Sequence, residues 1–266
     1  MNSQLDNLED RLHFAVEIAR ESGTLIMGYF RSVDLSVDFK SDDSPVTKAD
    51  KEAELLLRKR IEEKYPEDGI LGEEFAEKKS QSGIRWILDP IDGTKAFMHG
   101  VPLFGTLIGM TQDNAPLLGV CHLPAVKETI YAAVGHGAWW QVDEEPIREA
   151  KVSEVENISE ALLCYTEINL FHREGRFEGF DRLRQKVRAT RGWGDCFGHM
   201  LVATGRAEIA PDPILNIWDA SPMLPILQEA GGYFIDGNGN PTIEGGHGIS
   251  VNAQLKDEVL NCLQKS

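Results

Sequence analysis

Three strand-like segments joined by short turns constrain the fold of this chain more than any other feature. Apolar residues dominate 103–110, 117–122 and 129–134, and turn-forming residues lie between these segments. Strands this short and this closely spaced commonly pair with their neighbours in an antiparallel sheet. Trp86-Ile-Leu88 is a further short apolar segment that precedes them. We therefore expect an antiparallel sheet in the first half of the chain.

Helical periodicity comes before these strands. Apolar residues from Leu8 to Ile26 recur at helical spacing, which predicts an amphipathic helix. Thr47 followed by Asp50 matches a capping box, and the apolar positions after it predict a second helix that ends near Tyr65. The first half is therefore expected to combine helices and a sheet in an α+β arrangement.

The pattern changes in the second half of the chain. Strand and helix signals alternate from residue 161 to residue 235, which favours an α/β architecture. The acidic, proline-containing stretch 143–151 lies between the two patterns. We predict that the chain divides there into an N-terminal half, 1–142, and a C-terminal half, 143–266.

Composition and charge argue against several classes of protein. The 266 residues are 42% hydrophobic, which is enough for one large domain or two fused halves. The formal net charge of −16 disfavours contact with nucleic acid and with anionic membranes. No apolar run approaches the roughly 20 residues that cross a membrane, and the acidic N-terminus does not resemble a secretory signal. We expect a cytoplasmic protein whose four cysteines are reduced thiols.

The segment 86–94 carries the strongest local chemical signal. Asp89 and Asp92 stand three residues apart just after a strand end, and Gly93-Thr94 follows them. Carboxylate and carbonyl oxygens of this kind suit Mg²⁺. The backbone N–H groups of Gly93 and Thr94 are candidates for holding a phosphate. Because the chain is strongly acidic, a bound cation would be needed to attract such an anion.

Each acidic candidate also has an ordinary structural interpretation. Asp89 and Asp92 fit an Asx-turn in a loop. Glu73 could belong to a solvated charge run, and Asp219 could cap the helix that it opens. Asp50 has the capping-box interpretation given above. A metal site requires that these residues, far apart in the sequence, converge in the fold.

Four segments together resemble the inositol monophosphatase superfamily of Mg²⁺-dependent phosphatases. In chain order they are 44–50, 71–74, 86–94, and 218–222 followed by 229–232. Because they occur in the order found in that superfamily, the resemblance covers most of the chain. It implies a layered αβαβα sandwich of the type shared with fructose-1,6-bisphosphatase, and a homodimer.

The resemblance also implies roles for individual residues. The matching positions bind two or three Mg²⁺ ions per active site, and here the implied ligands are Glu73, Asp89, the Ile91 carbonyl, Asp92 and Asp219. The implied catalytic residues are Glu73, Thr94 and Asp50. Thr94 and Asp50 would orient a water molecule and take up its proton. The N-terminal half would carry most of the metal-binding motifs, and the C-terminal half the substrate-specificity segment.

The segment around Asp195 bears on which phosphate ester is hydrolysed. Superfamily members that act on inositol phosphate carry small uncharged residues there, whereas this chain has a carboxylate, and Asp212 adds a second one. Two carboxylates suit an ammonium better than a neutral polyol, since each charge-assisted hydrogen bond contributes about 1.5–3 kcal/mol. The Gly-Asp-Cys-aromatic pattern at 194–197 resembles the histidinol-phosphate phosphatase branch. Alternatively, Asp195 could cap a helix, or Arg191 could neutralise it.

The leading hypothesis is therefore Mg²⁺-dependent hydrolysis of histidinol phosphate, a small phosphorylated metabolite, in histidine biosynthesis. The substrate-binding residues would be Gly93, Thr94, Asp195 and Asp212. One alternative is an inositol-1-monophosphatase or a broad-specificity sugar or polyol phosphatase. An alternative of another class is an interaction protein that keeps the fold without catalysis. No nucleic-acid or membrane partner is expected.

Overall fold

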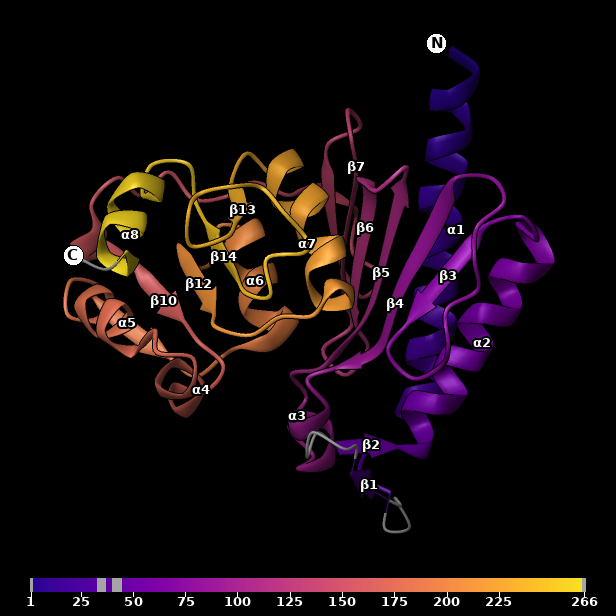
Figure 1. Ribbon diagram of the computed structural model, residues 1–266, viewed down its shortest axis with the longest axis horizontal. Coiled ribbons are helices and arrows are strands. Elements are labelled where there is room, and N and C mark those ends of the chain that lie inside the picture. The colour runs from indigo at the N-terminus through magenta and orange to yellow at the C-terminus, as the bar shows by residue number, and fades with distance from the viewer. Residues whose placement is uncertain (1, 33–36, 40–44, 265–266) are drawn as a thin grey trace.

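The computed structural model describes residues 2–32, 37–39 and 45–264, which form two large sheets and the helices that cover them (Figure 1). The helices are α1 (Asn2–Met27), α2 (Lys48–Lys64), α3 (Thr94–Met98), α4 (Ile168–Arg173), α5 (Phe177–Arg184), α6 (Asp195–Ala203), α7 (Ile217–Glu229) and α8 (Lys256–Leu263), with a 3-10 turn at Ile158–Glu160. The two helices predicted first correspond to α1 and α2, and both predictions are confirmed. Ser44, the first residue of the 44–50 segment, lies outside the described residues.

A seven-stranded sheet dominates the first half of the chain. Its strands lie in the order β3-β4-β5-β6-β7-β8-β9, and only β3 and β4 are parallel to each other. They are β3 (Gly69–Gly72), β4 (Ile84–Asp92), β5 (Gly105–Gln112), β6 (Ala115–Leu123), β7 (Glu128–Ala133), β8 (Ala138–Val142) and β9 (Arg148–Glu149). The predicted antiparallel sheet is confirmed. The sequence prediction misses β8 and β9, which are short and partly exposed at the edge of the sheet.

A five-stranded mixed sheet forms the second half. Its order is β11-β10-β12-β14-β13, in which β10 is parallel to its neighbours and β14 is antiparallel to both of its own. The strands are β10 (Leu162–Cys164), β11 (Ala189–Arg191), β12 (Ile209–Asp212), β13 (Tyr233–Ile235) and β14 (Gly248–Val251). A separate two-stranded sheet pairs β1 (Val37–Phe39) with β2 (Pro45–Thr47). The predicted alternation of strands and helices is confirmed.

The elements stack in five layers. Figure 1 shows α1 and α2 on the outer face of the seven-stranded sheet, α6 and α7 between the two sheets, and α5 and α8 on the far side of the five-stranded sheet. One cluster of buried apolar side chains packs the middle helices against both sheets, and two others lie between each sheet and its outer helices. The predicted αβαβα sandwich is therefore confirmed.

Two glycines let α7 lie directly on the seven-stranded sheet. A Cβ on Gly119 would lie 2.1 Å from the backbone oxygen of Pro222, and one on Gly109 would lie 2.2 Å from the Ser221 hydroxyl oxygen. α7 also contains Pro222 and Pro225 in its interior, which removes two backbone donors and disfavours a helix. Close packing on the glycines therefore stabilises a segment with weak intrinsic helical tendency.

The two halves of the chain share one core. Leu107 and Ile130 of the seven-stranded sheet are fully buried in the same cluster as Met200 and Ile226 of the middle helices. β9 also pairs with β8 in the first sheet, although it lies after residue 142. The division of the chain at 142/143 stays a prediction about its organisation.

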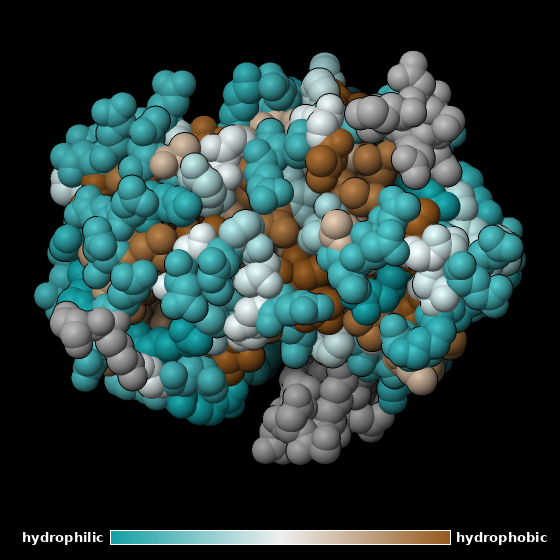
Figure 2. All heavy atoms as spheres, turned by 45° about the horizontal axis from the view of Figure 1, so that its top comes forward, coloured by the Kyte–Doolittle hydropathy of each residue, from teal (hydrophilic) through white to brown (hydrophobic). Residues whose placement is uncertain are grey.

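The surface and the cysteines agree with the compositional picture. The face of the molecule in Figure 2 is largely hydrophilic, with apolar residues gathered mainly toward its middle. None of the helices in the part of the chain that the structure describes is long and apolar enough to cross a bilayer. All four cysteines are buried and unpaired. Disulfide bonds therefore play no part in holding the two sheets together.

The contact between α7 and the sheet can be tested with Gly119→Ala. The added Cβ would meet backbone atoms of Pro222, which cannot move away without shifting the helix. We expect a loss of about 1–3 kcal/mol in the free energy of unfolding, measured by chemical denaturation. Gly192→Ala is the matched control, because the closest atom to its Cβ would be 3.9 Å away. Equal stability of the two variants would contradict this packing.

Candidate active site

A β-bulge in β4 brings Asp89 and Asp92 to the same face of the sheet. In a regular strand, residues three apart point to opposite faces. Here Asp89 pairs with Leu107 and Asp92 pairs with Gly105, so β4 has one more residue than β5 over this stretch. The extra residue shifts the alternation and turns both carboxylates to one side. The Ile91 N–H donates to Asp89 Oδ1 at 3.0 Å, so the Asx-turn is also present.

Glu73 follows the end of β3, and the parallel pairing of β3 with β4 holds it beside Asp89. The Glu73 N–H donates to the Leu88 carbonyl at 3.2 Å. Glu54, buried on α2, supports this turn, since its Oε2 accepts the Glu74 N–H at 2.7 Å. Sequence reasoning misses Glu54, because one glutamate among several in a charged helix has no distinguishing spacing.

α7 delivers Asp219 to the same place. Asp219 is the third residue of the helix, and its Oδ2 accepts the Asn216 N–H at 2.7 Å in a capping box. The helix-capping interpretation of Asp219 is therefore correct, and the same side chain also lies close to Asp89 and Asp92. One carboxylate oxygen from each of Asp89, Asp92 and Asp219 lies within 4.8 Å of the others. The fold thus gathers acidic residues from both halves of the chain.

We call Glu73, Asp89, Asp92 and Asp219 together the carboxylate cluster. Burial and mutual repulsion raise the pKa values of its three aspartates. Burial is the largest cause for Asp92, and with the charge of Asp219 it raises the pKa to about 7 despite hydrogen bonds from Cys196. Burial also raises the pKa of Asp219 to about 7. Burial, followed by the charge of Glu73, raises the pKa of Asp89 well above its ordinary value. A cluster that disfavours its own negative charge fits a divalent cation with oxygen ligands.

The predicted catalytic residues Thr94 and Asp50 lie at the edge of this cluster. The Thr94 hydroxyl donates to the Ile91 carbonyl at 3.0 Å. Asp50 Oδ2 accepts the Thr47 N–H at 2.7 Å and forms the capping box expected from the sequence. Burial raises the pKa of Asp50 to about 6 against the hydrogen bonds of Thr47, and the charge of Glu73 adds to the rise. Both catalytic candidates are described and no hydrogen bond joins them, so their cooperation stays a prediction.

Gly93 connects β4 to α3 in a left-handed conformation that favours glycine. The first N–H groups of a helix such as α3 have no acceptor within the helix. A Cβ on Gly93 would lie 3.0 Å from the Leu103 carbonyl oxygen and 3.4 Å from Asp195 Oδ2. The turn therefore places a group of backbone donors beside the carboxylate predicted to contact the substrate.

A cavity of about 420 Å³ opens beside the carboxylate cluster, and we call it the active-site cavity. Its charged wall residues are Asp92, Lys95, Arg173, Asp195, Asp212 and Asp219. A cavity of this volume suits a small metabolite. Both carboxylates predicted to bind the substrate therefore line the same space as two members of the cluster.

Asp195 begins α6 with a φ of 51°, which is unusual for a residue other than glycine. Gly194 occupies the capping position, so the helix-cap interpretation of Asp195 is wrong. The Asp195 N–H donates to Thr166 Oγ1 at 3.0 Å, and the Thr166 hydroxyl donates to Asp212 Oδ2 at 2.7 Å. Thr166 therefore joins the two carboxylates predicted to contact the substrate.

Arg191 does not neutralise Asp195. Its Nη1 donates to the Thr190 carbonyl at 2.7 Å, and no ion pair joins it to Asp195, although both residues are described. Burial, followed by the charges of neighbouring carboxylates, raises the pKa of Asp195 well above its ordinary value. Asp195 is thus a half-buried acid that Arg191 does not pair with, which leaves the substrate as a candidate counter-ion.

Sequence reasoning misses three further residues of the active-site cavity. Besides Thr166, these are Lys95, which pairs with Glu167 at 3.0 Å, and His199, whose Nε2 lies 3.7 Å from Asp212 Oδ2. A signal for His199 exists, since it stands four residues after Asp195 and therefore on the same face of a helix. Thr166 has no such signal, because its role depends on strand pairing in the second sheet.

Comparison with known proteins agrees with this geometry. The model of the inositol monophosphatase family matches residues 7–266. The chain is 43% identical over 238 residues to the histidinol-phosphatase of Chlorobaculum parvum, covering 90% of each protein. It is 36% identical to the histidinol-phosphatase of Mycobacterium tuberculosis, covering 96% of this chain and 98% of the relative. The solved structure of the Thermotoga maritima IMPase has a TM-score of 0.85 at 30% identity, covering 96% of each chain.

Fold, site and relatives together define a phosphatase, a hydrolase of small phosphate esters. The residues that line the cavity come from both sheets, as the layered fold requires. The chain belongs to the inositol monophosphatase family. The family resemblance and the prediction of an enzyme are confirmed, and the alternative of an interaction protein without catalysis is not favoured.

The raised pKa values predict how the metal-free protein responds to pH. A carboxyl with a raised pKa holds its proton more tightly in the folded state, so stability is lost as the pH rises from the unfolded value of about 4 toward about 7. In chelator, we expect the melting temperature to fall by about 5–10 °C between about pH 5 and pH 8. Mg²⁺ should restore it at the higher pH. Thermal unfolding followed by circular dichroism measures both effects.

Two variants serve as controls for this prediction. Asp92→Asn removes a member of the carboxylate cluster and should flatten the pH dependence. Asp143→Asn removes an exposed carboxylate far from β4 in the sequence and should leave it unchanged. A metal-free protein that melts at the same temperature at both pH values would show that the cluster is not under electrostatic strain.

Proposed function

We propose that this chain is a Mg²⁺-dependent histidinol-phosphate phosphatase, which hydrolyses histidinol phosphate to histidinol and phosphate in histidine biosynthesis. The observation that carries the proposal is the pair Asp195 and Asp212, joined through Thr166 on the wall of the active-site cavity. Two relatives, at 43% and 36% identity, bear the name histidinol-phosphatase and support the same substrate. The homodimer and the cytoplasmic location expected above remain predictions.

The carboxylate cluster and the Ile91 carbonyl are the groups proposed to hold two or three Mg²⁺ ions. All of these donors are oxygens, as Mg²⁺ requires, and three of the carboxylates approach within 4.8 Å of one another. The raised pKa values of Asp92 and Asp219 are the expected behaviour of acidic ligands without their cation. When bound, Mg²⁺ lowers the pKa of a water molecule and offsets the charge of the phosphoryl group.

The protein groups around this cluster supply positioning and proton transfer. The Thr94 hydroxyl donates its hydrogen bond to the Ile91 carbonyl, so its lone pairs are free to orient a water molecule. Asp50, with its pKa raised to about 6, and Glu73 are the proposed proton acceptors. The N–H groups of Gly93 and Thr94 would bind phosphoryl oxygens. Positioning and electrostatics of this kind carry most of phosphoryl transfer, so no covalent enzyme intermediate is required.

Asp195 and Asp212 are proposed to bind the cationic leaving group. Asp195 Oδ2 would lie 3.4 Å from a Cβ on Gly93, so its carboxylate adjoins the proposed phosphate position. Burial, followed by the charges of Asp92 and Asp212, raises the pKa of Asp195, and an ammonium group would offset both effects. A neutral polyol would leave a desolvated carboxylate without a counter-ion, which is unfavourable. Inositol phosphate is therefore expected to be the poorer substrate.

Substitution of Asp195 by Asn tests the substrate. The change keeps the shape but removes the charge that would pair with the amine. We expect kcat/KM for histidinol phosphate to fall about 10- to 100-fold, because one charge-assisted hydrogen bond is lost. Turnover of inositol 1-phosphate should change much less. Steady-state kinetics of both esters under Mg²⁺ give the comparison.

The wild-type protein and one further variant complete this test. Wild-type protein should prefer histidinol phosphate, and a strong preference for inositol phosphate would overturn the substrate while leaving the phosphatase chemistry intact. Asp143→Asn, which changes an exposed carboxylate, should behave like wild type with both esters. An equal fall in kcat/KM for both substrates in Asp195→Asn would mean that Asp195 supports the site but does not recognise the amine.

Substitution of Asp89 by Asn tests the metal site. The variant removes one charge from the carboxylate cluster, at one of the three aspartates that lie within 4.8 Å of one another. We expect turnover of any phosphate ester to fall at least about 100-fold, and the stabilisation by Mg²⁺ to weaken in thermal unfolding. Unchanged phosphatase activity in this variant would refute the proposed role of the cluster.

A further inference from the structure

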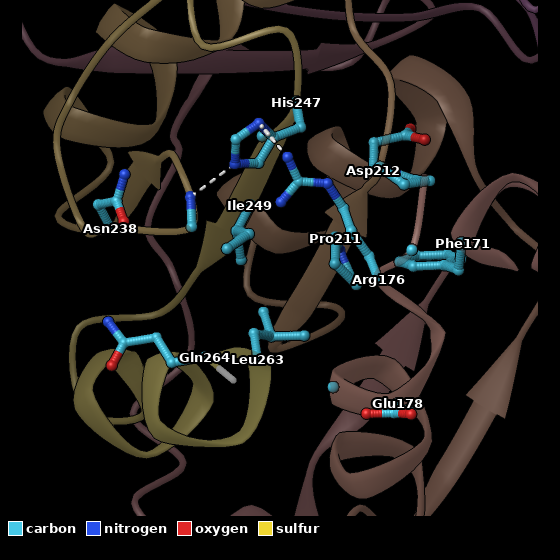
Figure 3. A pocket seen from close by; sticks show the side chains of 15 residues that line it. Phe171, Arg176, Glu178, Pro211, Asp212, Asn238, His247, Ile249, Leu263 and Gln264 are labelled. Atoms are coloured by element: carbon cyan, nitrogen blue, oxygen red, sulfur yellow. Dashed lines mark hydrogen bonds between the residues drawn. The ribbon is translucent and has the colours of Figure 1, made fainter. Parts of the chain in front are cut away.

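A second cavity, of about 550 Å³, adjoins the end of β12, and Asp212 lines both this cavity and the active-site cavity. Its walls come from α4, α5, β12, β14 and the end of α8. Figure 3 shows the apolar side chains of Phe171, Ile249 and Leu263 around it, together with the guanidinium of Arg176. A cavity of this size accommodates a small organic molecule.

The hydrogen bonds of His247 determine whether the Arg176 guanidinium can donate a hydrogen bond to its ring. His247 Nε2 lies 2.8 Å from the Gly237 N–H, and Nδ1 lies 2.7 Å from the Gly245 carbonyl. A neutral ring satisfies both backbone groups only if Nε2 accepts and Nδ1 carries the proton. Arg176 Nη2, 3.1 Å from Nδ1, then faces a donor and cannot give a hydrogen bond to this ring (Figure 3). The guanidinium therefore lies beside His247, but the ring does not accept a hydrogen bond from it.

Other neighbours position Arg176 but do not neutralise it. A Cβ on Gly237 would lie 3.6 Å from Arg176 Nη1, so the guanidinium packs against this turn. No carboxylate forms an ion pair with Arg176 among the residues that the structure describes. Two acidic residues line the same cavity. Glu178 lies well away from the guanidinium in Figure 3, and Asp212 forms no ion pair with Arg176, although both residues are described. In a chain of net charge −16, a cation in this state is a candidate anion receptor.

We propose that this second cavity binds a small organic carboxylate and that its occupancy alters substrate binding in the active-site cavity. The planar carboxylate would pair with the Arg176 guanidinium in the bidentate geometry that arginine favours. The apolar body would rest against Phe171 and Leu263. A carboxylate fits better than a phosphate, because a single guanidinium matches one negative charge, and the acidic residues Glu178 and Asp212 on the same wall would repel a more highly charged anion.

Asp212 and α4 provide the physical link between the two cavities. The Asp212 carboxylate is held by Thr166 in the active-site cavity, while the adjoining Pro211 lines the second cavity. On α4, Phe171 lines the second cavity and Leu170 lines the active-site cavity. A ligand that shifts β12 or α4 therefore moves Asp212 relative to the substrate. This link rests on the function proposed above, whereas binding to the second cavity does not.

Binding is tested with 4-bromobenzoate on the full chain in the presence of Mg²⁺ and without substrate. Methyl NMR signals of Ile249 and Leu263 should shift on titration, and crystals soaked with the probe should show bromine density in the second cavity. Arg176→Gln should weaken the affinity about tenfold or more. The neutral analogue 4-bromobenzamide should bind the wild-type protein as weakly as 4-bromobenzoate binds the variant.

The matched control is Arg184→Gln, which removes the arginine at the other end of α5, the helix that Arg176 caps. Arg184 lies outside the cavity, and its variant should bind 4-bromobenzoate like the wild type. Absence of methyl shifts at millimolar 4-bromobenzoate would overturn the proposal. Equal affinity of the wild type and Arg176→Gln would also overturn it. Because this readout uses no substrate, it can succeed even if the proposed substrate is wrong.

The link to the active site is tested by kinetics with histidinol phosphate. Saturating 4-bromobenzoate should change KM at least twofold in the wild type and in Arg184→Gln, and leave it unchanged in Arg176→Gln. Binding by NMR with an unchanged KM would refute the link. An equal effect on Arg176→Gln would place the probe in the active-site cavity and refute the proposal.

Discussion

Repulsion among carboxylates gathered at one point is the interaction on which the rest of this structure depends. Three separate devices create it: the bulge in β4, the parallel pairing of β3 with β4, and the close approach of α7 to the sheet. None of these arrangements lowers the energy of the acidic side chains by itself, as the raised pKa values show. Packing elsewhere in the layers therefore holds the acids together, and the proposed cations would offset this repulsion and allow the cluster to attract a phosphate.

Much of the fold could be predicted from local sequence patterns. The strands of the first sheet and helices α1 and α2 follow periodicity and turn chemistry, both of which are properties of neighbouring residues. The prediction is weaker where an element depends on distant partners. α7 contains two prolines, and its helix exists because Gly109 and Gly119 allow close contact with the sheet. β11 and β14 are short strands with little alternation, so their pairing is a property of the whole second sheet.

The candidate site divides in the same way. Asp89, Asp92, Glu73 and Asp219 stand in motifs whose spacing marks them, and the structure brings the three aspartates within one ion's reach. Thr166, Lys95 and Glu54 act through contacts between segments that are distant in the sequence, and no local pattern distinguishes them. Asp195 shows the limit of capping rules, because glycine and aspartate are both accepted at the N-cap of a helix. Only the backbone geometry selects Gly194 as the cap and turns Asp195 toward the cavity.

The left-handed backbone at Asp195 costs conformational stability, but it carries a carboxylate on the wall of the active-site cavity. A non-glycine residue in this region costs on the order of 1 kcal/mol, which glycine at the same position would not incur. Selection for heat tolerance alone would therefore tend to exchange this aspartate for glycine and lose the carboxylate on the cavity wall. If Asp195 binds the cationic leaving group as proposed, an aspartate in this backbone conformation marks the choice of substrate and offers a way to distinguish phosphatases of one fold that differ in the ester they hydrolyse.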